Sequence, residues 1–146
     1  MLLESERPCG LESTSRAGYL PIVLSVVFPV RCGPGTEYLL GRLDANLAYF
    51  GGFDDVECVV VDSGSASGPR AHIRRACERP RCVLVDDPAP QTPFAPGATR
   101  NLGAERASGD TLVFFDVDLR CMPDFVPRVR AWADARRDQT TFLMIP

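Results

Sequence analysis

Short apolar runs that alternate with helical patterns constrain the fold of this chain more than any other feature. Residues 22–30 form an almost continuous apolar run rich in β-branched side chains, and similar runs recur at 56–62, 82–86 and 111–116. Runs of this length and composition are typical of strands that are buried on both faces of a sheet. A further run at 140–145 predicts a fifth strand.

The segments between these runs predict helices over 37–50, 69–79 and 98–108, and a last helix opened by Pro123 and Asp124. Strands that alternate with helices in units of about 30 residues indicate βαβ crossovers. The sequence therefore predicts an α/β fold, with a mainly parallel sheet and helices on both faces. We expect residues 21–146 to form one domain, preceded by a flexible N-terminal tail over residues 1–20, which lack periodicity.

Composition excludes several kinds of function. All sixteen basic residues are arginine, so the chain has no Schiff-base lysine and no P-loop lysine, and its single histidine, His72, excludes sites built from several histidines. A net charge of −3 offers no positive field for nucleic acid, and no apolar run approaches the roughly 20 residues needed to cross a bilayer. The six cysteines include no C-x-x-C pair, and the N-terminus lacks the apolar stretch of a signal peptide. We therefore expect a reduced, cytoplasmic protein without a nucleic-acid partner.

Acidic residues gather where the predicted strands end, which is where parallel α/β sheets bind their ligands. The strand ends carry the segments Pro29-Val30-Arg31, Asp62-Ser63, Asp86-Asp87 and Asp116-Val117-Asp118. Two carboxylates two residues apart, as in Asp116 and Asp118, can bind one divalent cation such as Mg²⁺ or Mn²⁺. Twelve aspartates in 146 residues give about one such pair by chance, so an exposed acidic turn is the alternative interpretation. The position of the pair, directly after a buried apolar run, favours the metal site.

Two further segments have both a binding and a structural interpretation. Asp62 and Ser63 can hydrogen-bond a nucleobase or a ribose, and Gly64 lets the backbone approach a ligand, but the same residues suit a strand-to-helix turn with serine capping. Arg100, at the start of a predicted helix, suits an anion such as a pyrophosphate, or an ion pair with one of the aspartates at 116 and 118. The two interpretations of Arg100 are compatible, because an arginine can also hold an acidic site together.

Four segments in this order resemble the N-terminal, nucleotide-sugar-binding half of family 2-type glycosyltransferases with the GT-A fold. They are LSVVFPVR at 24–31, VVVDSGS at 59–65, FAPGATRNLGA at 94–104, and ASGD at 107–110 followed by FFDVD at 114–118. The second is similar to the family's V-V-D-D-G-S, the third to its A-R-N-x-G segment and the last to its D-x-D motif. The resemblance covers residues 22–146 and implies a Rossmann-like GT-A nucleotide-binding sheet, truncated relative to the full fold.

The resemblance also implies a donor site and a metal site at the strand ends. Asp62 would contact the uracil or ribose, Arg100 would lie near the diphosphate, and Asp116 and Asp118 would hold Mn²⁺ or Mg²⁺. The implied reaction transfers a sugar, with inversion, from a nucleotide-diphosphate sugar such as a UDP-sugar to an unknown acceptor, a glycan or lipid-linked glycan. The implied nucleotide-binding residues are Pro29, Val30, Arg31, Asp62, Ser63, Arg100 and Asp116.

Two departures from the family pattern matter. Ser63 stands where the family has a second aspartate, so we expect base recognition to differ. The family continues into an acceptor-binding half that supplies the catalytic base, and no catalytic residue is identified in this chain. We therefore expect an apolar patch at the sheet edge against which the acceptor-binding half packs in the family. This patch would lead to self-association or would bind a partner chain. Peripheral attachment to a membrane is a further expectation.

Two other interpretations stay open. The chain is alternatively a non-catalytic or partner-dependent donor-binding half that lacks the acceptor domain. A third interpretation is a different α/β protein whose acidic strand ends hold Mg²⁺, such as a nucleotidyltransferase. Ligand preference separates the last from the others, because a nucleotidyltransferase should bind a nucleoside triphosphate and a sugar phosphate better than a UDP-sugar.

Overall fold

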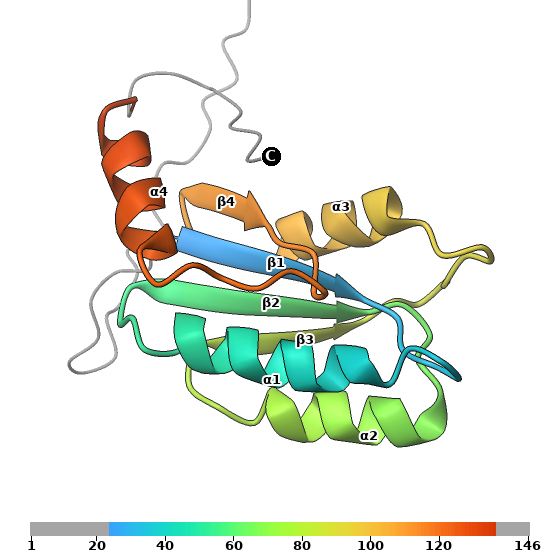
Figure 1. Cartoon of the computed structure of the whole chain (residues 1–146). Coiled ribbons are helices and arrows are strands. Elements are labelled where there is room, and N and C mark those ends of the chain that lie inside the picture. Colours follow the sequence, from blue (N-terminus) through green and yellow to red (C-terminus); the bar gives the residue numbers. More distant parts are fainter. Residues whose placement is uncertain (1–23, 137–146) are drawn as a thin grey trace, which may run out of the picture.

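The computed structural model describes residues 24–136, which fold into a four-stranded sheet with helices on both faces (Figure 1). The predicted tail over 1–20 and the predicted strand over 140–145 lie outside the described residues. In chain order the elements are β1 (Leu24–Val30), α1 (Tyr38–Phe50), β2 (Val56–Asp62), α2 (Ser67–Ala76), β3 (Cys82–Asp86), α3 (Pro96–Arg106), β4 (Thr111–Phe114) and α4 (Phe125–Asp134).

The sheet has the strand order β3-β2-β1-β4, and every neighbouring pair of strands is parallel. The chain first moves outward from β1 to β2 and β3, and then crosses to the other side of β1 to form β4. The direction of winding therefore reverses between β1 and β4, where open α/β sheets leave a crevice at the carboxyl ends of their strands. This arrangement confirms the predicted mainly parallel α/β fold.

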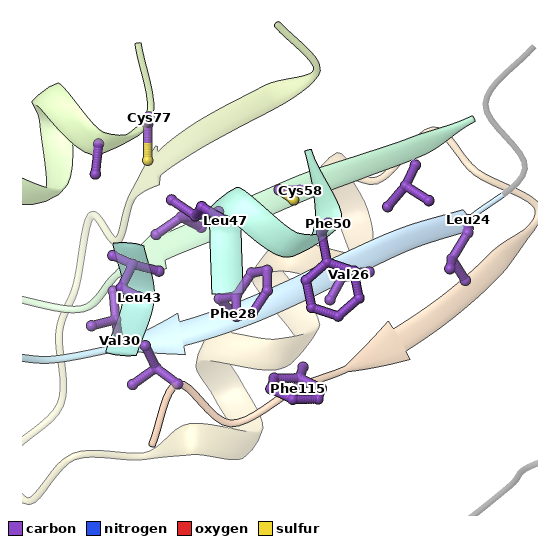
Figure 2. Packing of buried hydrophobic residues seen from close by; sticks show 14 of the residues in the cluster. Leu24, Val26, Phe28, Val30, Leu43, Leu47, Phe50, Cys58, Cys77 and Phe115 are labelled. Carbon is purple, nitrogen blue, oxygen red and sulfur yellow. The ribbon is translucent and has the colours of Figure 1, made fainter. Parts of the chain in front are cut away.

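One face of the sheet packs against α1, α2 and α4 and contains most of the apolar core. Because side chains alternate along a strand, this face receives Val26 and Phe28 of β1. The rings of Phe28, Phe50 and Phe115 meet edge to face, with centroids 5.5–5.8 Å apart (Figure 2). Such aromatic pairs add about 0.5–1.5 kcal/mol each beyond the burial of their area. Cys58 lies in the same core, as its place in an apolar run predicts.

The opposite face is covered by α3, which packs on Val27, Val59 and Val61 (Figure 1). Helices on both faces were predicted, and the two separate core clusters confirm them. β4 forms one edge of the described sheet, where Leu112 and Phe114 are 42% and 46% exposed. These two side chains form an exposed apolar pair at this edge, and self-association through it stays a prediction.

A buried polar cluster fixes the turn between α3 and β4 at the amino end of the sheet. The carboxylate of Glu57, only 6% exposed, accepts hydrogen bonds from Ser25 Oγ at 2.7 Å and from the backbone N–H and Oγ of Ser108 at 2.9 and 3.0 Å. The N–H of Gly109 donates to Ser25 Oγ at 2.8 Å. The cluster therefore ties the start of β4 to β1 and β2, and so helps to determine where the other end of β4 lies.

Several boundaries differ from those expected. α2 begins at Ser67 rather than at Pro69 and ends at Ala76, and α3 begins at Pro96 rather than at residue 98. Both prolines fit the first turn of a helix, because N–H groups there have no intrahelical acceptor. β4 ends at Phe114 rather than at residue 116, so the acidic pair lies in the loop just beyond the strand.

Candidate functional site

The carboxyl ends of β1 and β4 border a cavity of about 730 Å³, which lies at the switch point of the sheet. A volume of this size is within the range of about 300–1,000 Å³ that is typical of ligand pockets. Five of the predicted site residues line this cavity, namely Pro29, Arg31, Arg100, Asp116 and Asp118. The fold therefore brings together residues that are up to 89 positions apart in the sequence.

Arg100 and Asp116 form an ion pair inside this cavity. Arg100 lies in the second turn of α3, and its Nη2 is 2.5 Å from Asp116 Oδ1. Both side chains stay partly exposed, at 33% and 48%. The pair thus agrees with the structural interpretation of Arg100, and both residues also face the space that a ligand would enter.

The carboxylate of Asp118 lies on the same cavity and is exposed. Among residues 24–136, none donates a hydrogen bond to it or forms an ion pair with it. The described part of the chain contains no group of three or more His, Cys, Asp or Glu side chains able to hold a metal ion. A cation at Asp116 and Asp118 would therefore need further oxygen ligands from water or from a bound phosphate. This donor set fits Mg²⁺, which commonly binds through one or two carboxylates together with substrate phosphates.

Arg31 joins the end of β1 to the loop that precedes α3. Its Nη1 donates to the carbonyl oxygen of Gln91 at 2.5 Å, and its Nη2 donates to Thr92 Oγ1 at 3.3 Å. The aromatic side chains of Tyr38 and Phe94 line the same cavity and are 63% and 36% exposed. The sequence analysis assigns neither aromatic residue to the site, although Phe94 begins the third segment of the resemblance, because their closeness to the cavity depends on how α1 and the loop before α3 fold back.

Asp62 is not part of this cavity, although the resemblance assigns it to the nucleotide. The residue is fully buried, and its Oδ1 accepts a hydrogen bond from the N–H of Ser65 at 2.9 Å. Its Oδ2 is 3.1 Å from Nε of Arg70 in α2. The carboxylate thus stabilises the turn from β2 into α2. Val30 is also buried in the core and does not line the cavity.

Ser63 lies on a second, smaller cavity of about 190 Å³ beside the first. Its Oγ donates to Asp87 Oδ2 at 2.7 Å, which links the ends of β2 and β3. Asp87 lines this cavity as well, and the sequence marks it only as one of several acids at strand ends. Its closeness to Ser63 follows from the parallel register, in which Asp62 lies opposite Asp86.

Cys32 lines the larger cavity but is not an open nucleophile. It is 1% exposed, and its Sγ–H donates to the carbonyl oxygen of Thr36 at 3.1 Å. Burial raises the pKa of this thiol above its ordinary value. The thiol is therefore a weak candidate for covalent chemistry at the site.

This fold and site define an α/β protein of the doubly wound type, with two carboxylates and two arginines at its switch point. The chain belongs to the family described as glycosyltransferase like family 2, whose family model matches residues 25–136. The resemblance inferred from the four sequence segments is thereby confirmed. Comparison with curated protein sequences found no match.

Solved structures with the same fold include S. aureus TarS and a mannosyltransferase. S. aureus TarS 1–349 is 20% identical to this chain, with a TM-score of 0.64 over 80% of this chain and 33% of that one. The same TarS fragment in complex with UDP-GlcNAc also has a TM-score of 0.64, at 20% identity over 80% of this chain and 32% of that one. Mannosyltransferase PcManGT from Pyrobaculum calidifontis, in complex with GDP-Man and Mn²⁺, is 23% identical, with a TM-score of 0.61 over 82% of this chain and 36% of that one. The chain thus spans about a third of the length of these neighbours. At these identities the likeness shows the fold.

Among the described residues, no helix is both long and apolar enough to cross a bilayer.

Proposed function

We propose that this chain is the donor-binding part of a glycosyltransferase that uses a nucleotide-diphosphate sugar, with a UDP-sugar as the expected donor. The observation that carries the proposal is the carboxylate of Asp118, which has no partner among residues 24–136 and lies with the Arg100–Asp116 pair on the cavity at the switch point of the sheet. The UDP-GlcNAc and GDP-Man complexes of its structural neighbours support this class of ligand.

In this proposal, different residues of the cavity bind different parts of the donor and its cation. Arg100 offers positive charge to the diphosphate, and Arg31, which lines the same cavity, would contact the nucleotide. Asp116 and Asp118 supply the carboxylate oxygens for Mn²⁺ or Mg²⁺. When bound, such a cation would stabilise the negative charge that grows on the departing nucleoside diphosphate.

The proposed transfer is a direct displacement at the anomeric carbon of the sugar. The bond from this carbon to the diphosphate oxygen breaks, and the nucleoside diphosphate leaves with the electron pair. An acceptor oxygen forms the new bond from the opposite face, which inverts the configuration, and its proton passes to a general base. We assign neither this base nor the acceptor, for which a glycan or a lipid-linked glycan is our expectation.

Calorimetric titration of UDP and UDP-sugars, with and without Mn²⁺, tests the donor site directly. We expect wild type to bind them in a metal-dependent manner, and Asp118→Ala to lose the metal-dependent part. Asp110→Ala is a matched control, because Asp110 is also an exposed aspartate but lies at the other end of β4. Folded wild-type protein that binds no nucleotide diphosphate would overturn the proposal.

A second candidate function is a non-catalytic or partner-dependent donor-binding module. The observation that favours it is that the acidic side chains described around the larger cavity, Asp116 and Asp118, are the proposed metal ligands, which leaves no described general base there. Sugar transfer by the isolated chain would exclude this candidate. Donor binding without transfer, with transfer restored by a second chain, would support it.

A further inference from the structure

The smaller cavity contains a carboxylate that the proposed donor site does not yet use. Asp62, the first acidic candidate for the nucleoside, is buried and bonded to Ser65 and Arg70. Asp87, at the end of the next strand, lines the smaller cavity of about 190 Å³. The acidic group available to a ligand at this part of the sheet edge is therefore Asp87.

The walls of this cavity suit a flat heteroaromatic ring. Most lining residues are apolar, including Pro88, Ala95 and Leu102. The polar lining groups are Ser63, Asp87, Gln91 and Thr99, of which Asp87 alone carries a charge. A pocket with apolar walls and a few placed polar groups binds the faces of a ring by contact and selects it by its edge.

Asp87 is held in place while it keeps the capacity to accept further hydrogen bonds. Its Oδ2 accepts from Ser63 Oγ at 2.7 Å, and its Oδ1 accepts from the N–H of Ala89 at 2.9 Å. An ionised carboxylate has about four acceptor positions, so each oxygen can accept one more donor. The two internal bonds thus preorganise an acceptor that faces the cavity.

The two cavities are close enough in the fold to share one ligand. Ser63 and Ala95 line the smaller cavity, and the residues that follow them in the chain, Gly64 and Pro96, line the larger one. Arg31 of the larger cavity also donates to the carbonyl oxygen of Gln91, which lines the smaller one. A nucleotide with its diphosphate near Arg100 can therefore extend toward Asp87.

We propose that Asp87 selects the nucleobase of the donor, accepting bases with a ring N–H, uracil or guanine, and rejecting cytosine and adenine. This inference rests on the proposed donor function. Uracil N3–H and guanine N1–H can donate to the carboxylate. The ring nitrogens at the same edge of cytosine and adenine are acceptors, so a carboxylate oxygen placed to accept from a ring N–H would meet a lone pair there. These two bases can donate only through the neighbouring exocyclic amino group, which requires the ring to shift in the cavity. The carboxylate of Asp87 thus takes the role toward the base that the resemblance assigns to Asp62, which is buried here.

Calorimetric titrations of UDP, GDP, CDP and ADP in the presence of Mn²⁺ test this selection. We expect the better of UDP and GDP to bind about 10- to 100-fold more tightly than CDP and ADP, the range for a hydrogen bond to a charged group. Asp87→Asn should weaken the binding of the better of UDP and GDP by about tenfold or more. The binding of CDP should not weaken, because an amide can donate to the cytosine ring nitrogen. Pyrophosphate with Mn²⁺ should bind wild type and Asp87→Asn equally.

Asp86→Asn is the matched control. Asp86 is the neighbouring aspartate, but it pairs with Arg74 at 2.7 Å and lines neither cavity. Asp87→Ser, which also removes the carboxylate, is the second variant if Asp87→Asn does not fold, and it should likewise weaken the better of UDP and GDP. Binding of all four with equal affinity, or an unchanged order in folded Asp87→Asn, would overturn the inference and leave the donor function standing. Binding of none by folded wild type would overturn both.

Discussion

Replacing Gly103 by alanine should destabilise this chain, although alanine is the better helix former. Gly103 lies inside α3, at the point where this helix touches the sheet. A Cβ atom there would lie 2.3 Å from Val27 Cγ1 and 3.0 Å from Val61 Cγ2. Both valines are fully buried, so neither can turn away from the added methyl group.

The size of the effect follows from two opposing terms. Glycine to alanine in a helix interior gains about 1 kcal/mol of helix propensity. An added methyl group in a well-packed core costs about 1–3 kcal/mol, and a contact more than 1 Å too short falls at the upper end of this range. The net loss is then about 2 kcal/mol. For a domain of this size that corresponds to a melting temperature about 8 °C lower.

Thermal and urea denaturation followed by circular dichroism measure this difference. Gly97→Ala is the matched control, since Gly97 lies in the first turn of the same helix with no atom within 4 Å of an added Cβ. We expect Gly97→Ala to be as stable as wild type, or more stable by less than about 1 kcal/mol. A Gly103→Ala variant as stable as Gly97→Ala would refute the close packing of α3 on β1 and β2.

Two further predictions concern buried groups. Asp62→Ala should lower the free energy of unfolding in urea by about 2–3 kcal/mol, because it leaves the buried N–H of Ser65 without an acceptor; unchanged stability with weaker nucleotide binding would contradict its structural role. Burial raises the pKa of the Cys58 thiol from 9.0 to about 12 in the folded chain. Folding therefore favours the protonated thiol, and its contribution to stability is fully present below pH 9 and is lost as the pH rises toward 12. Urea titrations at pH 9 and pH 10 measure how much the free energy of unfolding falls between these two pH values. We expect this fall to be about 1 kcal/mol smaller in Cys58→Ala than in wild type, and equal falls would show that Cys58 is not buried in this way.

Features that depend on the pattern of a short segment were predictable from the sequence. The buried strands and the helices between them follow from the composition and period of short segments, because burial on both faces requires continuous apolar runs. The acidic pair at 116 and 118 and the arginine at 100 were identified by their places at a strand end and a helix start. In the structure, all three line one cavity. Their roles toward a donor and a metal stay predictions.

The role of Asp62 could not be predicted in the same way. Whether a carboxylate at a strand end faces a ligand or the protein depends on its neighbours. Here the N–H of Ser65 and the guanidinium of Arg70 converge on it from the following turn and helix. Asp87 is the converse case, because its contact with Ser63 joins residues 24 positions apart through the pairing of β2 with β3.

The sequence by itself determined the α/β class, the family and the residue types at the strand ends, because these depend on patterns within single segments. Only the tertiary structure decided which strand ends meet at one cavity and which carboxylates stay available. The order β3-β2-β1-β4 places β1 beside β4, and this contact brings Arg31 to the same cavity as Asp118. The availability of a charged group depends on burial and on the donors around it, and those come from segments that are distant in the chain.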